Sequence, residues 1–436
     1  MTDRPDPGDD LRGLLADCVH CGFCLSACPT YLLDAAEPDS PRGRIQLIGQ
    51  IADAGTVTPV QAAHLDNCLG CLACMPACPS GVRYDRLIEH AREQVEEGHS
   101  RSRRERILRG FVFALFPHPA RLRLIRPALW VYQRFLARLV SRLLPGVLRD
   151  MAALAPEVRN LRSGSLPALT PPTGPRRAVV GLVTGCVQRV FFPEVNRATA
   201  QVLAAEGCEV RVPRAQGCCG ALSAHAGRTE EARRFARGLI EAFEDSGADI
   251  VVVNAAGCGA TVKDYGHLLA DDPEWADRAT RFAAKVRDAT EWLAELGPGA
   301  AKRPVELNVA YQDACHLRNG QGIVGQPRTL LNAVPGLELR EVAEPGVCCG
   351  SAGIYNLLQP DTAARLGDRK AEQVRATGAD VLATANPGCA MQIRQALRRS
   401  GSDIPVMHVM EVLALGLADQ PDAEGPFSAG RRSSSR

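Results

Sequence analysis

The chain has 436 residues, a formal net charge of +2 and a hydrophobic content of 46%. Its length predicts two or three domains, and the hydrophobic content excludes a generally disordered polymer. The near-neutral charge favours no particular class of partner, and we expect no nucleic-acid partner.

The first ten residues, MTDRPDPGDD, are acidic and polar, with no basic stretch followed by an apolar one. They do not resemble a secretory signal, so we expect a cytoplasmic protein. Thiols stay reduced in the cytoplasm, where spaced cysteines bind metal more often than they form disulfides. The chain contains 17 cysteines, most of them in short motifs, which makes metal binding the first expectation.

Residues 1–96 contain the motif C-x2-C-x2-C-x3-C-P twice, at 18–29 and 68–79, with an offset of 50. The two-residue spacers let one tight loop present three thiolates to a cubane cluster, and in two-cluster ferredoxins of this type the fourth cysteine ligates the other cluster. We therefore expect a helical ferredoxin-like domain with two 4Fe-4S clusters. The expected ligands are Cys18, Cys21, Cys24 and Cys78 for one cluster, and Cys68, Cys71, Cys74 and Cys28 for the other. Zinc sites and structural cysteines rarely show eight cysteines in this interlocked spacing.

Charged residues near the first motif have two interpretations. Arg42 and Arg44 follow the motif and either screen the negative charge of the clusters or lie on the surface. His20 stands between two expected ligands and is interpreted as a solvated loop residue rather than as a group that tunes the cluster by hydrogen bonding.

Residues 97–150 form a basic and apolar segment, in which positions 101–149 hold twelve arginines and one acidic residue. Pro127 is predicted to start a helix, because proline is tolerated at the first helical position. The basic stripe of that helix would consist of Arg134, Arg138 and Arg142. Such a helix either lies at an anionic membrane surface or packs on protein with its arginines solvated. No run in the chain is apolar over the ~20 residues that span a bilayer.

Two segments have the composition of connections rather than of packed structure. Residues 151–177 are rich in proline, serine and glycine and are predicted to be a linker. Residues 419–436, which end in GRRSSSR, are predicted to be a disordered tail.

Residues 178–418 contain a second internal repeat. Short apolar runs alternate with stretches of helical spacing, which favours parallel strands with helices between them. The repeated cysteines are Cys186 and Cys315, Cys218 and Cys348, Cys219 and Cys349, and Cys258 and Cys389. A glycine follows each Cys-Cys pair. We expect two α/β Cys-Cys-Gly domains, at 178–300 and 301–418, related by a pseudo-twofold axis, and thus a multidomain chain of mixed α+β and α/β class.

The sequence leaves the role of these eight cysteines open. Four thiolates per half, brought together by loops at strand ends, are enough for a further iron–sulfur cluster. The alternative is a structural or redox-active set of cysteines, including vicinal disulfides. Cys208 differs from them, because it aligns with Leu337 in the repeat, and a position that accepts leucine is a core position.

Taken together, these motifs resemble the iron–sulfur subunit family of bacterial glycolate oxidase. The N-terminal match lies in Cys18-Val19-His20-Cys21-Gly22-Phe23-Cys24, Cys28-Pro29-Thr30-Tyr31, Asp39-Ser40-Pro41-Arg42-Gly43-Arg44-Ile45, His64-Leu65-Asp66 and Cys78-Pro79-Ser80-Gly81-Val82. The C-terminal match lies in Gly185-Cys186-Val187-Gln188, Gln216-Gly217-Cys218-Cys219-Gly220 and Cys348-Cys349-Gly350-Ser351-Ala352-Gly353-Ile354-Tyr355-Asn356. The resemblance covers nearly the full chain except the linker and the tail.

The resemblance implies an electron-transfer subunit without catalytic residues of its own. A separate FAD-containing subunit would oxidise a 2-hydroxy acid such as glycolate, and the clusters would pass the electrons to a membrane quinone or another acceptor. No flavin is expected on this chain, and a peripheral position at the inner face of the cytoplasmic membrane is a further expectation. The alternatives are the corresponding subunit of a lactate or anaerobic glycerol-3-phosphate dehydrogenase, or a reductase like heterodisulfide reductase.

One departure from the pattern bears on the last alternative. Similar domains in heterodisulfide reductases end in C-x2-C, which supplies a fifth cysteine per half. The corresponding segments here are Cys258-Gly259-Ala260-Thr261 and Cys389-Ala390-Met391-Gln392, without that cysteine. Its absence disfavours both a five-thiolate cluster and the reductase alternative.

Overall fold

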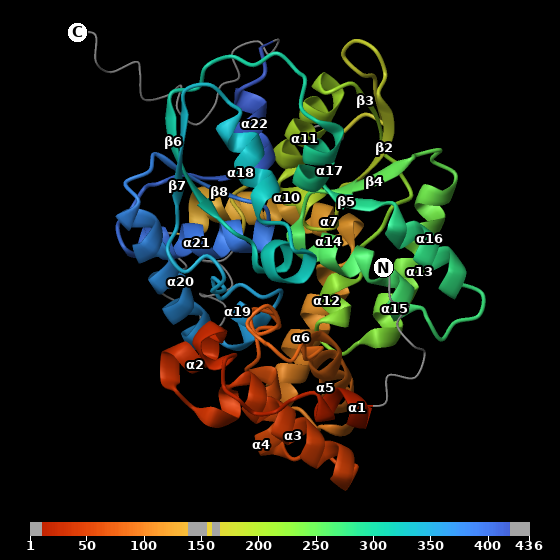
Figure 1. Ribbon diagram of the computed structural model, residues 1–436, viewed down its shortest axis with the longest axis vertical. Coiled ribbons are helices and arrows are strands. Elements are labelled where there is room, and N and C mark those ends of the chain that lie inside the picture. The colour runs from red at the N-terminus through yellow and green to blue at the C-terminus, as the bar shows by residue number, and fades with distance from the viewer. Residues whose placement is uncertain (1–10, 138–154, 159–165, 419–436) are drawn as a thin grey trace.

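The computed structural model of the chain describes residues 11–137, 155–158 and 166–418. It contains an N-terminal helical module and two α/β halves, each built around its own sheet (Figure 1). The module lies at one end of the molecule, and the two sheets lie beyond it. This architecture confirms the predicted fold class.

The N-terminal module is a set of short helices around a small apolar core that includes Ile48, Leu65 and Leu87. The helices are α1 (Leu11–Ala16), η1 (Leu25–Ala27), α2 (Pro29–Asp34), η2 (Glu37–Asp39), α3 (Pro41–Ala54), α4 (Pro59–Asp66) and α5 (Tyr84–Gly98). Helices α2, α3 and α4 begin with proline, whose missing N–H is not needed at the first helical position. The Ser40 hydroxyl caps α3 by accepting a hydrogen bond from the Gly43 amide. These caps fix the helix ends from which the cysteine loops leave.

The basic segment forms helices α6 (Arg103–Leu115) and α7 (Pro119–Val131), followed by a π-helical turn, η3 (Tyr132–Leu136). The prediction that a helix starts at Pro127 is wrong, because α7 starts at Pro119 and Pro127 lies inside it. An interior proline removes a backbone hydrogen bond at a cost of ~3 kcal/mol. Burial of Leu122 of α7 in a cluster with Leu115 and Phe191 offsets part of this cost.

The predicted basic stripe is only partly within the described residues. Arg134 is exposed on the π-helical turn, whereas Arg138 and Arg142 lie outside the described residues. Phe135 is 66% exposed, while Tyr132 lines a cavity. Across 11–137, 155–158 and 166–418, no helix has the length and apolar character that crossing a membrane requires.

The first α/β half has a five-stranded sheet in the order β1-β3-β2-β4-β5. Its strands are β1 (Leu169–Thr170), β2 (Ala178–Val183), β3 (Cys208–Arg211), β4 (Ile250–Val253) and β5 (Val286–Asp288). Its helices are α10 (Gln188–Phe191), α11 (Pro193–Ala205), α12 (Ala221–Ala224), α13 (Thr229–Glu244), α14 (Ala256–Lys263), α15 (Tyr265–Leu268), α16 (Ala276–Ala284) and α17 (Ala289–Leu296). Strands β2 to β5 are parallel, whereas β1 pairs antiparallel with β3. Part of the predicted linker is therefore an edge strand, because its backbone completes the hydrogen bonding of β3.

The second half has a parallel sheet in the order β7-β6-β8-β9. Its strands are β6 (Leu307–Gln312), β7 (Leu337–Glu341), β8 (Val381–Thr384) and β9 (Val406–His408). Its helices are the π-helical η4 (His316–Gly320), α18 (Gly325–Asn332), α19 (Tyr355–Leu358), α20 (Pro360–Ala376), α21 (Pro387–Arg399) and α22 (Val409–Leu415). This order repeats β3-β2-β4-β5 of the first half, so the duplicated sequence folds into a duplicated sheet.

One hydrophobic core is common to the two halves. It extends from Val180 in β2 to Leu417 after α22 and includes residues from both sheets. Cys208 is fully buried in this core at the start of β3, as its alignment with Leu337 predicted. The two halves therefore form one folded body rather than two independent domains.

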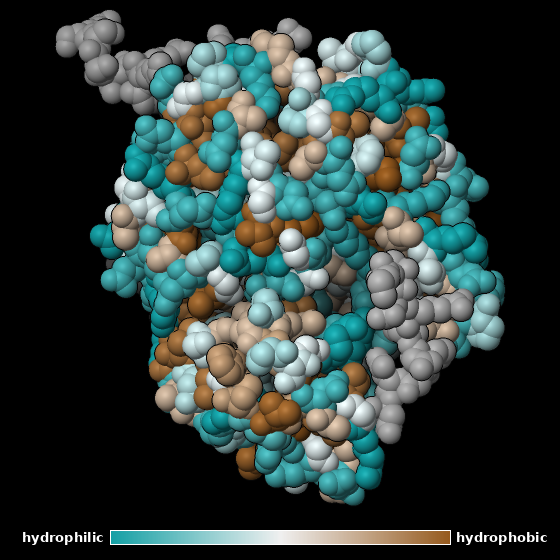
Figure 2. Space-filling model, in the orientation of Figure 1, coloured by the Kyte–Doolittle hydropathy of each residue, from teal (hydrophilic) through white to brown (hydrophobic). Residues whose placement is uncertain are grey.

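The N-terminal module packs directly on both halves. Arg86 of α5 makes two hydrogen bonds of 2.7 and 2.6 Å with the carboxylate of Asp264 in the first half. The hydroxyl of Tyr355 in the second half donates to Asn67 Oδ1 at 2.8 Å. In Figure 2 the visible face is mainly hydrophilic, with hydrophobic residues gathered where the module meets the second half. The linker does not keep the module apart from the halves.

Candidate iron–sulfur sites

The two cysteine loops of the N-terminal module follow the same backbone path. In the first loop His20 and Gly22 have φ angles of 55° and 90°, and in the second loop Gly70 and Leu72 have φ angles of 62° and 59°. These residues occupy equivalent positions in the repeat of 50. Left-handed backbone is uncommon outside glycine, and two such residues in each loop curl the chain into a tight turn around its cysteines.

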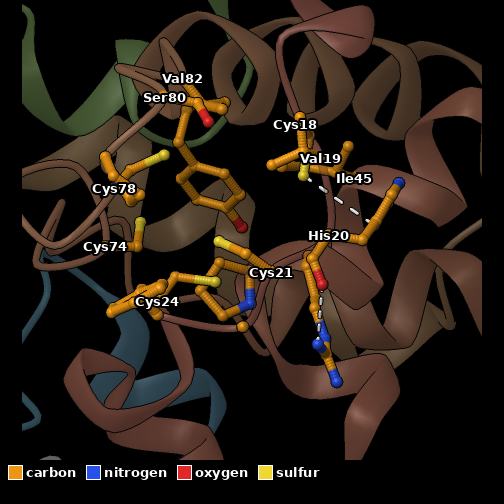
Figure 3. A pocket seen from close by; sticks show the side chains of 16 residues that line it. Cys18, Val19, His20, Cys21, Cys24, Ile45, Cys74, Cys78, Ser80 and Val82 are labelled. Carbon is orange, nitrogen blue, oxygen red and sulfur yellow. Dashed lines mark hydrogen bonds between the residues drawn. The ribbon is translucent and has the colours of Figure 1, made fainter.

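The first predicted ligand set lines one cavity near the surface of the module (Figure 3). The sulfur atoms around this cavity belong to Cys18, Cys21, Cys24, Cys74 and Cys78. Cys21 is exposed, and its neighbours Val19 and Phe23 are 68% and 66% exposed. His20 is also exposed, as predicted. The structure therefore brings Cys78 of the second motif to the three cysteines of the first, beside an apolar patch of surface.

The second predicted ligand set lines a separate, deeper cavity. Its cysteines are Cys28, Cys68, Cys71 and Cys74, and all four are buried. Burial raises the pKa of Cys71 and of Cys74 well above the usual thiol value. Because Cys74 lines both cavities, the two cavities adjoin. Four buried thiols are a donor set that a cluster of iron cations would hold as thiolates.

Arg44 is buried beside the second set, with 1% of its surface exposed. Its guanidinium donates to the His64 carbonyl at 2.8 Å and to Asp39 Oδ1 at 3.1 Å, and lies 4.0 Å from Cys28 Sγ. The interpretation of Arg44 as a surface residue is therefore wrong. Burial alone would raise the pKa of Cys68, but the charges of Arg44 and Arg92 outweigh it and lower that pKa.

Arg92 is a charged residue beside the second loop that the sequence analysis did not single out. Its guanidinium donates to the Cys68 carbonyl at 2.5 Å, next to the second loop. Arg42 occupies the equivalent place beside the first loop, where it donates to the His20 carbonyl at 3.0 Å. The two arginines are separated by the same 50 residues as the cysteine motifs. Extending the search for repeats beyond the cysteines would have found the pair.

In each α/β half the four cysteines follow three successive strands at their carboxyl ends. Cys186, Cys218, Cys219 and Cys258 follow β2, β3 and β4, and Cys315, Cys348, Cys349 and Cys389 follow β6, β7 and β8. The carboxyl ends of parallel strands form a common edge, where ligands bind in open α/β sheets. The sulfur atoms of Cys186 and Cys218 lie 3.6 Å apart. The fold thus gathers the cysteines of each half into one group.

The glycine after each Cys-Cys pair is required by the backbone. Gly220 and Gly350 have φ angles of 80° and 88°. A Cβ atom on Gly220 would lie 3.0 Å from the carbonyl oxygen of Ala232, and one on Gly350 would lie 2.7 Å from that of Ala363. Only glycine combines this conformation with this close approach, so the glycine sets the turn that presents the two thiols.

In both halves the second thiol of the pair has a lowered pKa. Hydrogen bonds from Cys218 and Cys258 lower the pKa of Cys219 well below the usual value, and those from Cys348 and Cys389 do the same for Cys349. In the second half a hydrogen bond from Cys348 also lowers the pKa of Cys315, to about 5. Thiols that lose their protons more readily are suited to binding a cationic cluster.

The donor sets fit clusters better than single ions. Within the part of the chain that the structure describes, no group of three or more His, Cys, Asp or Glu side chains is arranged to hold one metal ion. A cluster of four irons keeps its thiolates farther apart than one ion does, and soft thiolates are the usual ligands of iron–sulfur clusters.

The second loop of the module lies against the cysteines of the second half. Leu69 and Cys71 belong to the same apolar cluster as Cys348 and Tyr355, and Cys315 packs against it. The side-chain amide of Asn319 in η4 donates to the Cys71 carbonyl at 3.0 Å. No local pattern in the sequence predicts these contacts, because the residues are about 250 to 290 positions apart.

Three family models match four stretches of the chain. A 4Fe-4S dicluster domain matches residues 17–82, and a cysteine-rich domain matches residues 180–263 and 309–394. The linker region of the glycolate oxidase iron–sulfur subunit matches residues 104–155. These matches and the cysteine groups define an iron–sulfur protein that combines a 4Fe-4S dicluster domain with two cysteine-rich domains, and iron–sulfur clusters are its cofactors.

Full-length relatives identify the family. The chain is 39% identical to the probable glycolate oxidase iron–sulfur subunit of Bacillus subtilis (strain 168), over 92% of this chain and 94% of the relative. It is 35% identical to the glycolate oxidase iron–sulfur subunit of Escherichia coli (strain K12), over 94% and 95% of the two chains. The chain belongs to the glycolate oxidase iron–sulfur subunit family.

More distant comparisons cover a part of the chain or the fold alone. Lactate utilization protein A of Exiguobacterium sp. (strain ATCC BAA-1283 / AT1b) is 35% identical, over 55% of this chain and 98% of the relative. A hypothetical protein from Helicobacter pylori has a TM-score of 0.53 at 9% identity, over 88% of this chain and 70% of that chain. The second comparison supports a common fold and nothing further.

Proposed function

We propose that this chain is the electron-transfer subunit of a flavin-dependent 2-hydroxy-acid dehydrogenase whose substrate is glycolate. An FAD-containing partner subunit removes two electrons and two protons from the hydroxy acid, which becomes a 2-oxo acid. This chain accepts the electrons and passes them toward a quinone or another acceptor. The printed names of the full-length relatives favour glycolate over lactate.

The observation that carries this proposal is the succession of cysteine groups through the molecule. The first ferredoxin set borders on solvent, and Cys74 joins its cavity to that of the second set. The second set contacts the Cys315 group through Cys71. Electron transfer slows steeply with distance, so adjoining groups form a path from the surface into the α/β halves.

The proposed ligands follow from the cavities. One 4Fe-4S cluster binds Cys18, Cys21, Cys24 and Cys78, and the other binds Cys28, Cys68, Cys71 and Cys74. The four-cysteine group of each half holds a further cluster, since the fold brings its thiols together at the carboxyl ends of the strands and they hydrogen-bond one another.

The flavoprotein docks where the first set reaches the surface. Val19 and Phe23 form an exposed apolar patch on either side of Cys21. Contact there places the electron donor close to the first cluster. The buried position of Cys28, Cys68 and Cys71 keeps the second cluster from reacting directly with small oxidants in solution.

The test is to purify the chain together with its flavoprotein subunits and to offer glycolate, lactate and glycerol 3-phosphate as electron donors. The proposal is supported if electron paramagnetic resonance shows that glycolate reduces the clusters. Anaerobic analysis should find about eight iron atoms in the N-terminal module alone. If lactate or glycerol 3-phosphate reduces the clusters in preference to glycolate, the chain is the subunit of the corresponding alternative dehydrogenase instead.

We also propose that the surface around α7 attaches the chain peripherally to the cytoplasmic face of the membrane. Leu124 is 80% exposed and Phe135 is 66% exposed, and Arg121, Arg123 and Arg134 are exposed around them. Liposomes with anionic lipid should carry the wild-type protein in flotation at low salt. The double variant Leu124→Ser with Phe135→Ser should float less, whereas Val60→Ser, which removes a 65% exposed residue of α4, should float normally.

A further inference from the structure

A cavity of about 630 Å³ lies between the two α/β halves and helices α6 and α7. Its volume lies within the range of small-molecule sites. One end is lined by Cys186, Cys218, Cys258, Cys315, Cys348 and Cys389. The other end is lined by Phe111, Leu115, Leu122, Ile125, Leu129 and Tyr132. Clusters on the cysteines would fill the first end and leave the apolar end free.

The apolar end reaches the surface along α6 and α7. Phe111 is 54% and Ile125 is 38% exposed, and both line the cavity. Ala128 of α7 also lines it and is exposed. The exposed side chain of Leu124 lies on the same helix. An apolar molecule can therefore enter from the surface around α7 that we assign to membrane attachment.

Two half-buried histidines stand at the inner end. The rings of His225 and His316 are 4.8 Å apart between centroids, and both line the cavity. The Nε2 atom of each is buried and has no hydrogen-bond partner among the described residues. A buried polar atom without a partner is energetically unfavourable. Two such atoms at the end of an apolar cavity are suited to a ligand with a polar head and an apolar body.

A second, polar cavity lies on the other side of the same histidines. Its volume is about 410 Å³, and Arg92, His225 and His316 line both cavities. The polar cavity is also lined by Glu89, Asp264 and His267. The histidine pair therefore separates a polar space from the apolar one.

We propose that the apolar cavity is the site at which this chain reduces its final acceptor, a quinone with an isoprenoid or alkyl chain. This proposal rests on the proposed function and adds the class and the binding site of the acceptor. The quinone ring lies next to the cysteine groups with a carbonyl oxygen near His225 and His316. The apolar chain runs along α6 and α7 to the surface.

The reaction balances with the oxidation at the flavoprotein. The hydroxy acid releases two electrons and two protons, and the quinone takes up two electrons from the clusters and two protons from water to form the quinol. The polar cavity brings that water to the side of the histidine pair opposite the quinone. No other oxidant or reductant is required.

The test uses the complete complex with glycolate as donor and either decylubiquinone or the water-soluble dye 2,6-dichlorophenolindophenol as acceptor. Ala128→Trp places a large ring in the mouth of the cavity and should raise the KM for decylubiquinone about tenfold, equivalent to ~1.4 kcal/mol, with unchanged dye reduction. Ala120→Trp, exposed on the same helix but outside the cavity, should change neither. An equal KM in the wild type and Ala128→Trp would overturn the proposal.

A second measurement keeps the two proposals apart. Equilibrium dialysis of decylubiquinone against the iron-loaded chain reports binding even when no donor reduces the complex. If the chain binds quinone but the complex does not oxidise glycolate, only the proposed function is wrong. If the complex reduces the dye normally but the chain does not bind quinone, only this inference is wrong. If the chain bound lipid with the same affinity whether or not quinone was present, lipid and quinone would not compete for one cavity. That result would also overturn this inference.

The histidine contact has its own spectroscopic test. A hydrogen bond lowers the infrared stretching frequency of a quinone carbonyl. His225→Phe should return that frequency toward the value of the free quinone, whereas His225→Gln, which keeps a hydrogen-bonding group, should restore part of the shift. An unchanged spectrum in His225→Phe together with His316→Phe would show that the head group does not lie at the pair. Iron content equal to the wild type serves as the check on folding.

Discussion

The two α/β halves have the same strand order and the same four cysteines, but they have different neighbours. The Cys315 group of the second half lies against Cys71 of the ferredoxin module. In the first half, Val187 next to Cys186 packs into the apolar cluster of α6 and α7. The two similar donor groups therefore have different surroundings, which would give them different places in the proposed path of the electrons.

The largest expected effect comes from interrupting this path at one half or the other. Cys315→Ala removes the group beside the ferredoxin module, so glycolate should still reduce the ferredoxin clusters while quinone reduction falls to background. Cys186→Ala should leave a larger residual rate, because the second half still receives electrons. Freeze-quench electron paramagnetic resonance can follow both steps. Equal loss in the two variants would mean that the halves act in parallel or not at all.

Replacing the glycine of each Cys-Cys-Gly motif compares the halves in stability. Gly220→Ala and Gly350→Ala both place a side chain in left-handed backbone, at about 1–2 kcal/mol. An added Cβ atom would lie 2.7 Å from a carbonyl oxygen at Gly350 and 3.0 Å from one at Gly220. The closer approach should raise the total loss of unfolding free energy to about 3 kcal/mol in the second half, against about 2 kcal/mol in the first. Gly378→Ala, with a φ of 64° and no atom within 4 Å, is the control without a clash. Denaturant unfolding of the iron-loaded chain measures all three.

The halves also differ in the residue that caps their last helix. Asp288 caps α17 and His408 caps α22, each with a glutamate three residues later. Burial lowers the pKa of His408 to about 4. As the pH falls from about 6.5 to 4, the unfolded chain binds a proton that the folded chain does not, so stability decreases by about 3 kcal/mol. Above pH 6.5 this group contributes no pH dependence.

His408→Asn keeps a capping side chain and removes this titration. The unfolding free energy of the variant should therefore fall less steeply than that of the wild type between pH 6.5 and 4. Asp288 provides the contrast. Burial raises its pKa, so its contribution to the unfolding free energy falls as the pH rises. A variant with the same slope as the wild type would assign the acid sensitivity to other groups.

The smallest expected effect lies at the junction between the second half and the module. Tyr355→Phe removes the hydrogen bond to Asn67 and should cost about 1 kcal/mol. Tyr311→Phe is the matched control in the same half, because the buried Tyr311 hydroxyl has no hydrogen-bond partner among the described residues. Thermal unfolding, monitored by the absorbance of the clusters, distinguishes the two variants. Equal midpoints for both variants would show that the junction does not depend on this contact.

The repeats explain how much of this structure could be predicted from sequence. The cysteine spacing predicted two interleaved groups, because in two-cluster ferredoxins with this spacing the fourth cysteine ligates the other cluster. The start of α7 was not predictable in the same way, since both Pro119 and Pro127 can begin a helix and the packing of Leu122 favours the first. The docking of the module had no sequence signal, because Arg86 and Asp264 are 178 residues apart.

The core shared by the two halves has a consequence for biosynthesis. Helix α11 packs against α22, the last helix within the described residues. During translation the first half therefore leaves the ribosome with an apolar face that stays uncovered until the end of the second half has been made. A nascent chain in this state is prone to aggregate. Cluster insertion into the α/β halves would then follow release of the completed chain.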